Sequence, residues 1–433
     1  MAKYTIEGRF DGAEVTFETQ VTKEFGDLEL FGTLVQWKEV KHKTYWERVG
    51  VGGSITANAI VYQDTVYFGS CDKNFYAVSL EGKEIWRFET KGTIQTWAGA
   101  AGGFVYFSSS DGNLYAVDAR TGEEKWRFQA TGLGNTPLVH KGRIYWAAGD
   151  CGLYAIGAEK GEQVWRFKAK ALLSLPLIQG EKIYTGYEDG VMYALNMRGE
   201  VLWQFAAKAW IAAWPPAYYQ GTVFFGSQDK NLYALDSESG ELKWKFQAPD
   251  VVHSPVVLDG KVYVGCQDQN LYCLDAVRGR LLWRYRSGGA ISNVRAHGNR
   301  VYFGCYDNNL YCLDALSGRL VWKFKTNGFV HGAPAVHGNF VIFGSWDCNL
   351  YCLTLDGKLA WKFPTSLSTP SRIEPPEAAP SKVATITWTP VTKEEEKKYK
   401  KDEVDIADYG EFSGQYIDTT KSDYLGKKKK GYM

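Results

Sequence analysis

The sequence has no excess of charge of either sign. Its 433 residues include 50 lysines and arginines against 49 aspartates and glutamates, which leaves a formal net charge of +1 at pH 7. A balance this close creates no global field that would draw a polyanion to the surface. We therefore expect no binding to nucleic acid.

Long hydrophobic runs are also missing. The first nine residues contain no apolar leader and no small-residue cleavage site, and no cysteine stands nearby to carry a lipid. The longest weakly polar stretch, 209–219, is too short to cross a bilayer and includes two prolines. We expect a cytoplasmic protein that does not insert into a membrane.

The eight cysteines are never adjacent, never form a Cys-x-x-Cys pair and do not cluster with histidine. Structural metal sites need ligands at such spacings. The sequence therefore predicts no metal site, and we expect no bound cofactor.

One unit is repeated through most of the chain. Its clearest copy, 221–246, reads as three short strands joined by two tight turns. The tryptophan in the last strand recurs 38 to 41 residues apart, at Trp86, Trp126, Trp165, Trp203, Trp244, Trp283, Trp322 and Trp361. A period of about 40 residues with several short strands is typical of a β-propeller, in which each copy is one blade.

We therefore predict an all-β, eight-bladed β-propeller over residues 45–364. The blades are expected near 54–90, 93–130, 133–169, 172–207, 210–248, 251–287, 290–326 and 329–364. Cysteines recur at two positions of the unit: Cys273, Cys312 and Cys352 at one, and Cys266 and Cys305 at the other. Equivalent positions lie a blade apart, which is too far for a disulfide, so we interpret these residues as small buried hydrophobes.

An aspartate stands four residues before the blade tyrosine in every copy, from Asp72 to Asp347, and asparagine follows it by two residues in six of them. This pattern predicts a turn in which Asp caps its own backbone and Asn or Gly accepts a positive φ. The pattern does not supply the five or more oxygen ligands of a calcium site.

Two extensions flank the predicted propeller. Residues 1–44 contain a predicted β-hairpin that turns at Asp11-Gly12. A strand around Trp46 resembles a ninth blade strand, and the residues alone leave open which strand closes the ring. Residues 365–433 begin as a proline-rich linker with one short strand predicted within 383–388 and continue as a charged tail.

Aromatic residues are spaced along that tail, among them Tyr409, Phe412, Tyr416 and Tyr424. This spacing suits a segment that folds onto a partner protein. The alternative is a tail that only keeps the protein soluble.

One copy of the unit resembles the PQQ-like, or quinoprotein-type, β-propeller repeat. This copy reads Phe104-Val-Tyr-Phe-Ser-Ser-Ser-Asp-Gly-Asn-Leu-Tyr-Ala-Val-Asp-Ala-Arg-Thr-Gly-Glu-Glu-Lys-Trp-Arg-Phe. The likeness extends over about 310 residues and implies the fold rather than an activity, because the family includes dehydrogenases, scaffolds and sensor domains. The quinoprotein dehydrogenases have a vicinal cysteine pair beside the quinone, which this chain lacks. The resemblance is closer to the non-enzymatic scaffold branch, which assembles outer membranes without PQQ and carries a lipid anchor missing here.

A binding site is expected where loops enter the innermost strands. Counting nine residues past each tryptophan marks a mostly polar set, which we call the axial ring. Its predicted ligand-binding residues are Thr56, Gln95, Asn135, Ser174, His253, Ser292 and His331, with Ala212 in the remaining place. These side chains suit a small ligand or a peptide tip, and the alternative is that they are polar only because the channel is wet.

A second group consists of Trp97, Trp210 and Trp214, of which Trp97 and Trp214 are predicted near the starts of innermost strands. Such side chains are enriched at interface hot spots, although packing in the core is the alternative for each. The favoured hypothesis is a non-catalytic scaffold, an accessory subunit of a larger cytoplasmic assembly that binds other proteins through its extensions. The alternative is a propeller that binds a small ligand or cofactor, with a redox role among the options. Sugar binding by repeated blade sites is a weaker third hypothesis.

Overall fold

The computed structural model describes residues 2–10, 13–24, 27–30, 52–132, 134–186, 188–212, 215–365 and 387–390. Within these ranges every regular element is a strand. The chain divides into two compact units, one formed by 1–41 with 377–433 and the other by 42–376.

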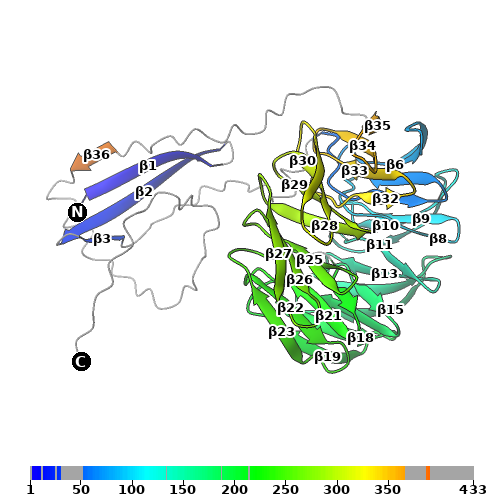
Figure 1. Cartoon of the computed structure of the whole chain (residues 1–433), viewed down its shortest axis with the longest axis horizontal. Coiled ribbons are helices and arrows are strands. Elements are labelled where there is room, and N and C mark those ends of the chain that lie inside the picture. The colour runs from blue at the N-terminus through cyan, green and yellow to red at the C-terminus, as the bar shows by residue number, and fades with distance from the viewer. Residues whose placement is uncertain are drawn as a thin grey trace. The chain divides into compact units, whose positions relative to one another are not determined.

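The smaller unit contains one four-stranded sheet (Figure 1). Strands β1 (Ala2–Phe10) and β2 (Ala13–Glu24) form an antiparallel hairpin in which Phe10 faces Ala13, so two residues connect them. The predicted hairpin is thus confirmed, while its turn at 11–12 lies outside the described residues. Strand β3 (Asp27–Leu30) pairs with β2, and β36 (Thr387–Pro390), which overlaps the strand predicted within 383–388, pairs with β1.

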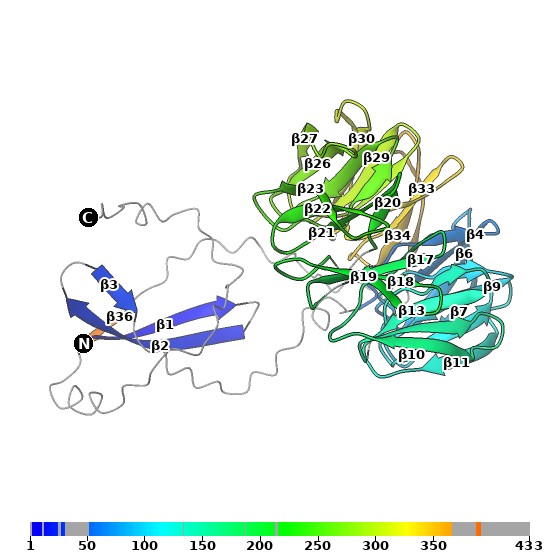
Figure 2. The ribbon, with the colours of Figure 1, turned by 90° about the horizontal axis from the view of Figure 1, so that it is seen from below.

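The larger unit consists of eight four-stranded antiparallel sheets, which confirms the eight-bladed propeller (Figures 1 and 2). Blade 1 contains β4 (Ile60–Tyr62), β5 (Thr65–Gly69), β6 (Asn74–Ser79) and β7 (Glu84–Glu89). Blade 2 contains β8 (Gly99–Ala101), β9 (Phe104–Ser108), β10 (Asn113–Asp118) and β11 (Glu124–Gln129). Blade 3 contains β12 (Leu138–His140), β13 (Arg143–Ala148), β14 (Gly152–Gly157) and β15 (Gln163–Lys168). Blade 4 contains β16 (Leu177–Gln179), β17 (Lys182–Gly186), β18 (Val191–Asn196) and β19 (Val201–Ala206).

The second half of the ring repeats this plan. Blade 5 contains β20 (Ala217–Tyr219), β21 (Thr222–Gly226), β22 (Asn231–Asp236) and β23 (Leu242–Gln247). Blade 6 contains β24 (Val256–Leu258), β25 (Lys261–Gly265), β26 (Asn270–Asp275) and β27 (Leu281–Arg286). Blade 7 contains β28 (Ile291–His297), β29 (Arg300–Cys305), β30 (Asn309–Asp314) and β31 (Leu320–Lys325). Blade 8 contains β32 (Ala335–His337), β33 (Phe340–Gly344), β34 (Asn349–Thr354) and β35 (Leu359–Pro364).

The two middle strands of each blade form the core. Their side chains are almost fully buried, whereas the last strand alternates exposed and partly buried residues, so that strand is the outer edge. The five repeat cysteines predicted to be buried are each at most 1% exposed, which confirms that interpretation.

The aspartate turn is built as predicted, with one correction. In blade 1 Asp72 accepts the backbone N–H of Asn74 at 3.0 Å through Oδ1 and the Tyr76 hydroxyl at 2.5 Å through Oδ2. The same two bonds recur in all eight blades. The residue with positive φ, however, directly follows the aspartate, as at Lys73 with φ of 72°. Asn74 therefore stays in the strand, because its N–H and the tyrosine must both reach one carboxylate.

The repeated tryptophans join neighbouring blades. Trp86 donates its indole N–H to the Ala119 carbonyl of blade 2 at 3.0 Å. Equivalent bonds link Trp126 to Ala158, Trp165 to Met197, Trp203 to Ser237, Trp244 to Ala276, Trp322 to Leu355 and Trp361 to Leu80. The Trp361 bond closes the ring between blades 8 and 1.

Ring closure needs no shared blade, because blades 1 and 8 are each complete with four consecutive strands. The junction is held by the Ile55 N–H, which donates to the Ser345 carbonyl at 3.1 Å, and by Thr365, whose hydroxyl donates to the Gly53 carbonyl at 2.8 Å. The strand predicted around Trp46 lies outside the described residues.

Candidate functional site

The axial-ring residues stand directly before the inner strands, in segments that pack between blades. Their apolar neighbours, including Ile55, Ile94 and Ile291, are fully buried. A Cβ on Gly69 would lie 2.1 Å from Ile94 of the next blade, so only glycine allows this approach. These apolar residues fix the height and orientation of the polar ring residues beside them.

Three ring residues are brought together across blades 7, 8 and 1. Ser292 donates its hydroxyl to the His331 carbonyl at 2.5 Å, and the Asn293 amide donates to the same carbonyl at 3.2 Å. His331 Nδ1 lies 3.3 Å from the Thr56 carbonyl. All of these residues are buried. Part of the ring's polarity is therefore used to hold neighbouring blades together.

The remaining predicted ring residues are placed on other blades. Asn135 accepts the Thr136 N–H through its side chain at 2.8 Å. Ser174 donates to its neighbour's carbonyl, and Gln95 lies beside the Cys71 thiol. Burial raises the pKa of that thiol to about 12, which makes it a poor nucleophile at neutral pH.

The two ring histidines are neutral at pH 7. Burial, and then the proximity of His331, lower the pKa of His253 to about 4. Burial also lowers the pKa of His331. His253 Nε2 is enclosed and has no hydrogen-bond partner among the described residues. The same holds for both amide atoms of Asn58, a residue that is 3% exposed.

Aromatic side chains gather beside His331. Tyr306, Phe329 and Trp346 pack with ring centroids 5.0 to 6.3 Å apart, and the Tyr306 ring lies 5.9 Å from His331. The sequence analysis missed this cluster. Tyr306 and Trp346 occupy the variable position directly before the turn aspartate, which was examined only for its turn chemistry.

The aromatic residues predicted to bind partners lie on separate blades. Trp97, leading into blade 2, donates its backbone N–H to the Thr136 hydroxyl of blade 3 at 3.0 Å. Trp210, leading into blade 5, is 46% exposed. Trp214 and the tail residues Tyr409, Phe412, Tyr416 and Tyr424 lie outside the described residues.

The outer strands present apolar residues that were not predicted as a site. On blades 6 and 7 six apolar residues of the outer strands and of the turns that precede them are 40% to 73% exposed; we call this group the rim patch. It consists of Val277, Leu281, Leu282, Leu316, Leu320 and Val321. The signal was available in the sequence, because Leu281 and Leu320 replace the glutamates of blades 1 and 2 two residues before the tryptophan.

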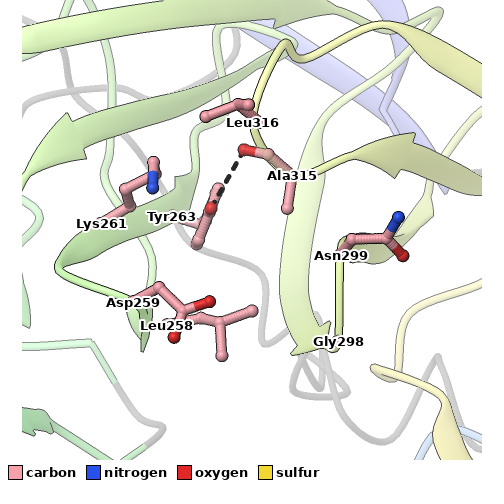
Figure 3. Close-up of a pocket in the computed structure, with 8 residues that line it drawn as sticks. All are labelled: Leu258, Asp259, Lys261, Tyr263, Gly298, Asn299, Ala315 and Leu316. Carbon is pink, nitrogen blue, oxygen red and sulfur yellow. Dashed lines mark hydrogen bonds between the residues drawn. The ribbon is translucent and has the colours of Figure 1, made fainter.

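A cavity of about 470 Å³ opens at the junction of blades 6 and 7, where Leu316 forms part of its wall (Figure 3). The β24–β25 turn contributes Asp259 and the β28–β29 turn contributes Asn299. The Tyr263 hydroxyl, also at the wall, donates to the Ala315 carbonyl at 3.0 Å.

The described part of the chain has neither a metal-binding cluster nor a membrane-spanning helix. Its histidine, cysteine, aspartate and glutamate residues form no group of three or more placed to hold a metal ion. It contains no helix of the length and apolar character needed to cross a bilayer.

Comparison with known proteins identifies the family. The model of the PQQ-like repeat family described as outer membrane protein assembly factor BamB matches residues 72–209, 188–297 and 287–385. These matches span more than half of the chain, so the protein belongs to the PQQ-like, BamB-type β-propeller family. None of the curated proteins matches the sequence.

Two solved structures share the fold. The computationally designed Ika8 protein superimposes with a TM-score of 0.63 at 17% identity, over 72% of this chain and 97% of that one. BamB from Moraxella catarrhalis superimposes with a TM-score of 0.57 at 18% identity, over 69% of this chain and 91% of that one. At these identities the likeness concerns architecture alone.

Proposed function

We propose that the protein is a non-catalytic scaffold that binds other proteins, as an accessory subunit of a larger cytoplasmic assembly. The observation that carries this proposal is the rim patch, in which six large apolar side chains on two neighbouring blades face solvent. Contiguous exposed apolar surface on a folded domain commonly marks a site of protein contact.

Two further features support a scaffold. The ring is stiff, because indole hydrogen bonds and buried apolar side chains join its blades. Membership of the BamB-type family supports protein–protein interaction in general without naming a partner. The eight free thiols, five of them in the blade cores, support the cytoplasmic part of the proposal, since reducing compartments preserve thiols.

The experiment is native mass spectrometry of the tagged full-length chain captured from cells that express it naturally. We expect a defined heteromeric mass. A full-length variant with four tail substitutions should lose those partners that bind through the tail. The substitutions are Tyr409→Ser, Phe412→Ser, Tyr416→Ser and Tyr424→Ser. A chain that always runs alone contradicts the scaffold proposal.

The alternative proposal is a propeller that binds a small ligand, with a redox role among the options, and it has its own supporting observation. His253 Nε2 and both amide atoms of Asn58 are enclosed polar atoms without partners among the described residues. Buried polar groups normally find a partner, so a small polar molecule would be stabilised there. A constant extra mass on the isolated chain that is lost on Asn58→Leu supports this alternative, and an unliganded mass contradicts it.

A further inference from the structure

The arginine that follows the blade tryptophan has an intramolecular partner in blades 1 and 2. Arg87 pairs with Glu84 at 2.7 Å, and Arg127 pairs with Glu124 at 2.6 Å. Each guanidinium also lies over a tyrosine ring of its own blade, Arg127 at 5.1 Å from the Tyr115 centroid. The cations of these outer strands are therefore already neutralised within the protein.

Blades 6 and 7 have lost that partner. The glutamate position holds Leu281 and Leu320, each 44% exposed, as it holds Leu242 and Leu359 in blades 5 and 8. The equivalents of Arg127 are Arg284 and Lys323, which are exposed and form no ion pair with any residue that the structure describes.

The outer strands of these two blades are basic. Strands β27 and β31 contain no aspartate or glutamate and carry Arg284, Arg286, Lys323 and Lys325. Asp275 and Asp314, at the turns before these strands, accept N–H groups of their own turns and lie 3.8 Å from Arg280 and 3.5 Å from Arg300. Two exposed apolar residues thus begin each outer strand, and cations follow at its fourth and sixth positions.

The junction beneath this surface is incompletely bonded. In the other seven blades the tryptophan N–H reaches a carbonyl of the next blade, but Trp283 Nε1 is enclosed without a partner in the described part of the chain. Its ring lies 5.8 Å from Tyr263, which lines the 470 Å³ cavity. Both Leu316, 73% exposed, and Lys261 lie at that cavity (Figure 3). The rim patch therefore adjoins a hollow that can take one apolar side chain.

We propose that the rim patch and the adjoining cavity dock an extended acidic segment of a partner protein, with its carboxylates on Arg284 and Lys323 and an apolar side chain in the cavity. This inference rests on the proposed scaffold function and specifies the partner's chemistry. The segment is extended because an outer strand offers a free backbone edge to which a strand can add. It is acidic because both edge strands are purely basic, and a second copy of the same rim would be repelled.

The probe is a fluorescein-labelled peptide of alternating glutamate and leucine, titrated against the full-length protein by fluorescence anisotropy. We expect saturable binding that weakens with added salt. The double variant Leu281→Glu/Leu320→Glu places carboxylates where blades 1 and 2 have them, beside Arg284 and Lys323. It should weaken binding by about tenfold or more, because the docking cations then gain internal partners.

The matched control is Val201→Glu, which makes the same change at the same repeat position of blade 4, where Val201 is 47% exposed. It should leave binding unchanged. The charge reversal Arg284→Glu/Lys323→Glu should transfer the preference to a peptide of alternating lysine and leucine. Each variant should have the same midpoint temperature of thermal unfolding as the wild type, which shows that its fold is retained.

Three outcomes would overturn the assignment: no saturable binding, equal loss in Val201→Glu, or displacement of the peptide by duplex DNA at an equal charge concentration. The two proposals fail separately. If the heteromeric mass of the full chain persists while the peptide does not bind, the scaffold stands and this site is wrong. If no heteromeric mass is found, the scaffold itself falls.

Discussion

Blades 1 and 2 and blades 6 and 7 are built on the same repeat, yet they present different outer surfaces. The buried positions match closely: Tyr67 of blade 1 and Tyr263 of blade 6 each donate to a carbonyl of the next blade. The exposed positions diverge, with Glu124 paired to Arg127 in blade 2 and, in blade 6, Leu281 beside Arg284, which has no ion pair among the described residues.

This difference separates the residues that build a blade from those that give it a task. A core side chain contacts the adjoining blade and changes only at the cost of packing. A residue on the outer strand is free to change, since a surface ion pair contributes about 1 kcal/mol or less. Loss of two such pairs at neighbouring blades therefore costs the fold little, while it creates an apolar and basic face.

The largest effect is expected where the blades are alike, at the close approach between neighbours. Gly69→Ala should lower the free energy of unfolding by about 3 kcal/mol, because its Cβ would lie 2.1 Å from Ile94. Gly265→Ala at the blade 6–7 junction should cost less, about 2 kcal/mol, since the nearest Ile291 carbon is 2.7 Å away. Urea unfolding measures both. Adding Ile94→Ala should relieve part of the Gly69→Ala loss, and strictly additive losses would contradict the clash.

The next largest effect is the pH dependence of stability caused by His253 of blade 6. The equivalent residues of blades 1 and 2, Thr56 and Gln95, do not titrate. The pKa of His253 lies near 4, against 6.5 for an unperturbed histidine. The folded state thus binds fewer protons than the unfolded state, so stability is present above pH 6.5 and is lost as pH falls toward 4. We expect a loss of about 3 kcal/mol between pH 7 and pH 4. His253→Gln should flatten this dependence in unfolding measured from pH 7 to pH 4, and an unchanged slope would assign it to other groups.

The smallest effect is the difference in stability loss between Trp→Phe substitutions at two junctions, that of blades 1 and 2 and that of blades 6 and 7. Trp86→Phe breaks an indole bond to Ala119 at 3.0 Å, whereas Trp283→Phe breaks none. The first substitution should therefore cost about 1 kcal/mol more than the second. Thermal and urea unfolding of the two variants provide the measurement. Equal losses would mean that Trp283 has a hydrogen bond in solution.

Much of the fold could be predicted because the residues that form each blade are close together in the sequence. The strands and turns of one unit contact each other within about 30 residues, so the period of Trp86 and its repeats and the Asp72-type turns were sufficient to predict eight blades. The position of the positive φ was wrong by one residue. Residue preference pointed to Asn74, whereas two simultaneous bonds to Asp72 place the left-handed conformation at Lys73.

The candidate sites were predicted less well. The axial ring was found by counting, but the count did not reveal that Ser292 and His331 bond across blades. Nor did it reveal that polar atoms of His253 and Asn58 have no partner within the part of the chain that the structure describes. The rim patch was missed because the repeats were compared for what they share. Its members lie outside the shared Asp, Tyr and Trp positions on which that comparison rested.

The sequence by itself determined the number of blades, their strands and the turn that ends each second strand, because these depend on contacts close in the chain. Only the tertiary structure decided how the ring closes, since Ile55 meets Ser345 and Leu80 meets Trp361 from opposite ends of the propeller. It also placed the cavity beside Leu316 at the junction of blades 6 and 7, whose outer strands carry Leu281 and Leu320. Residues from separate repeats become neighbours only when blades 6 and 7 pack side by side.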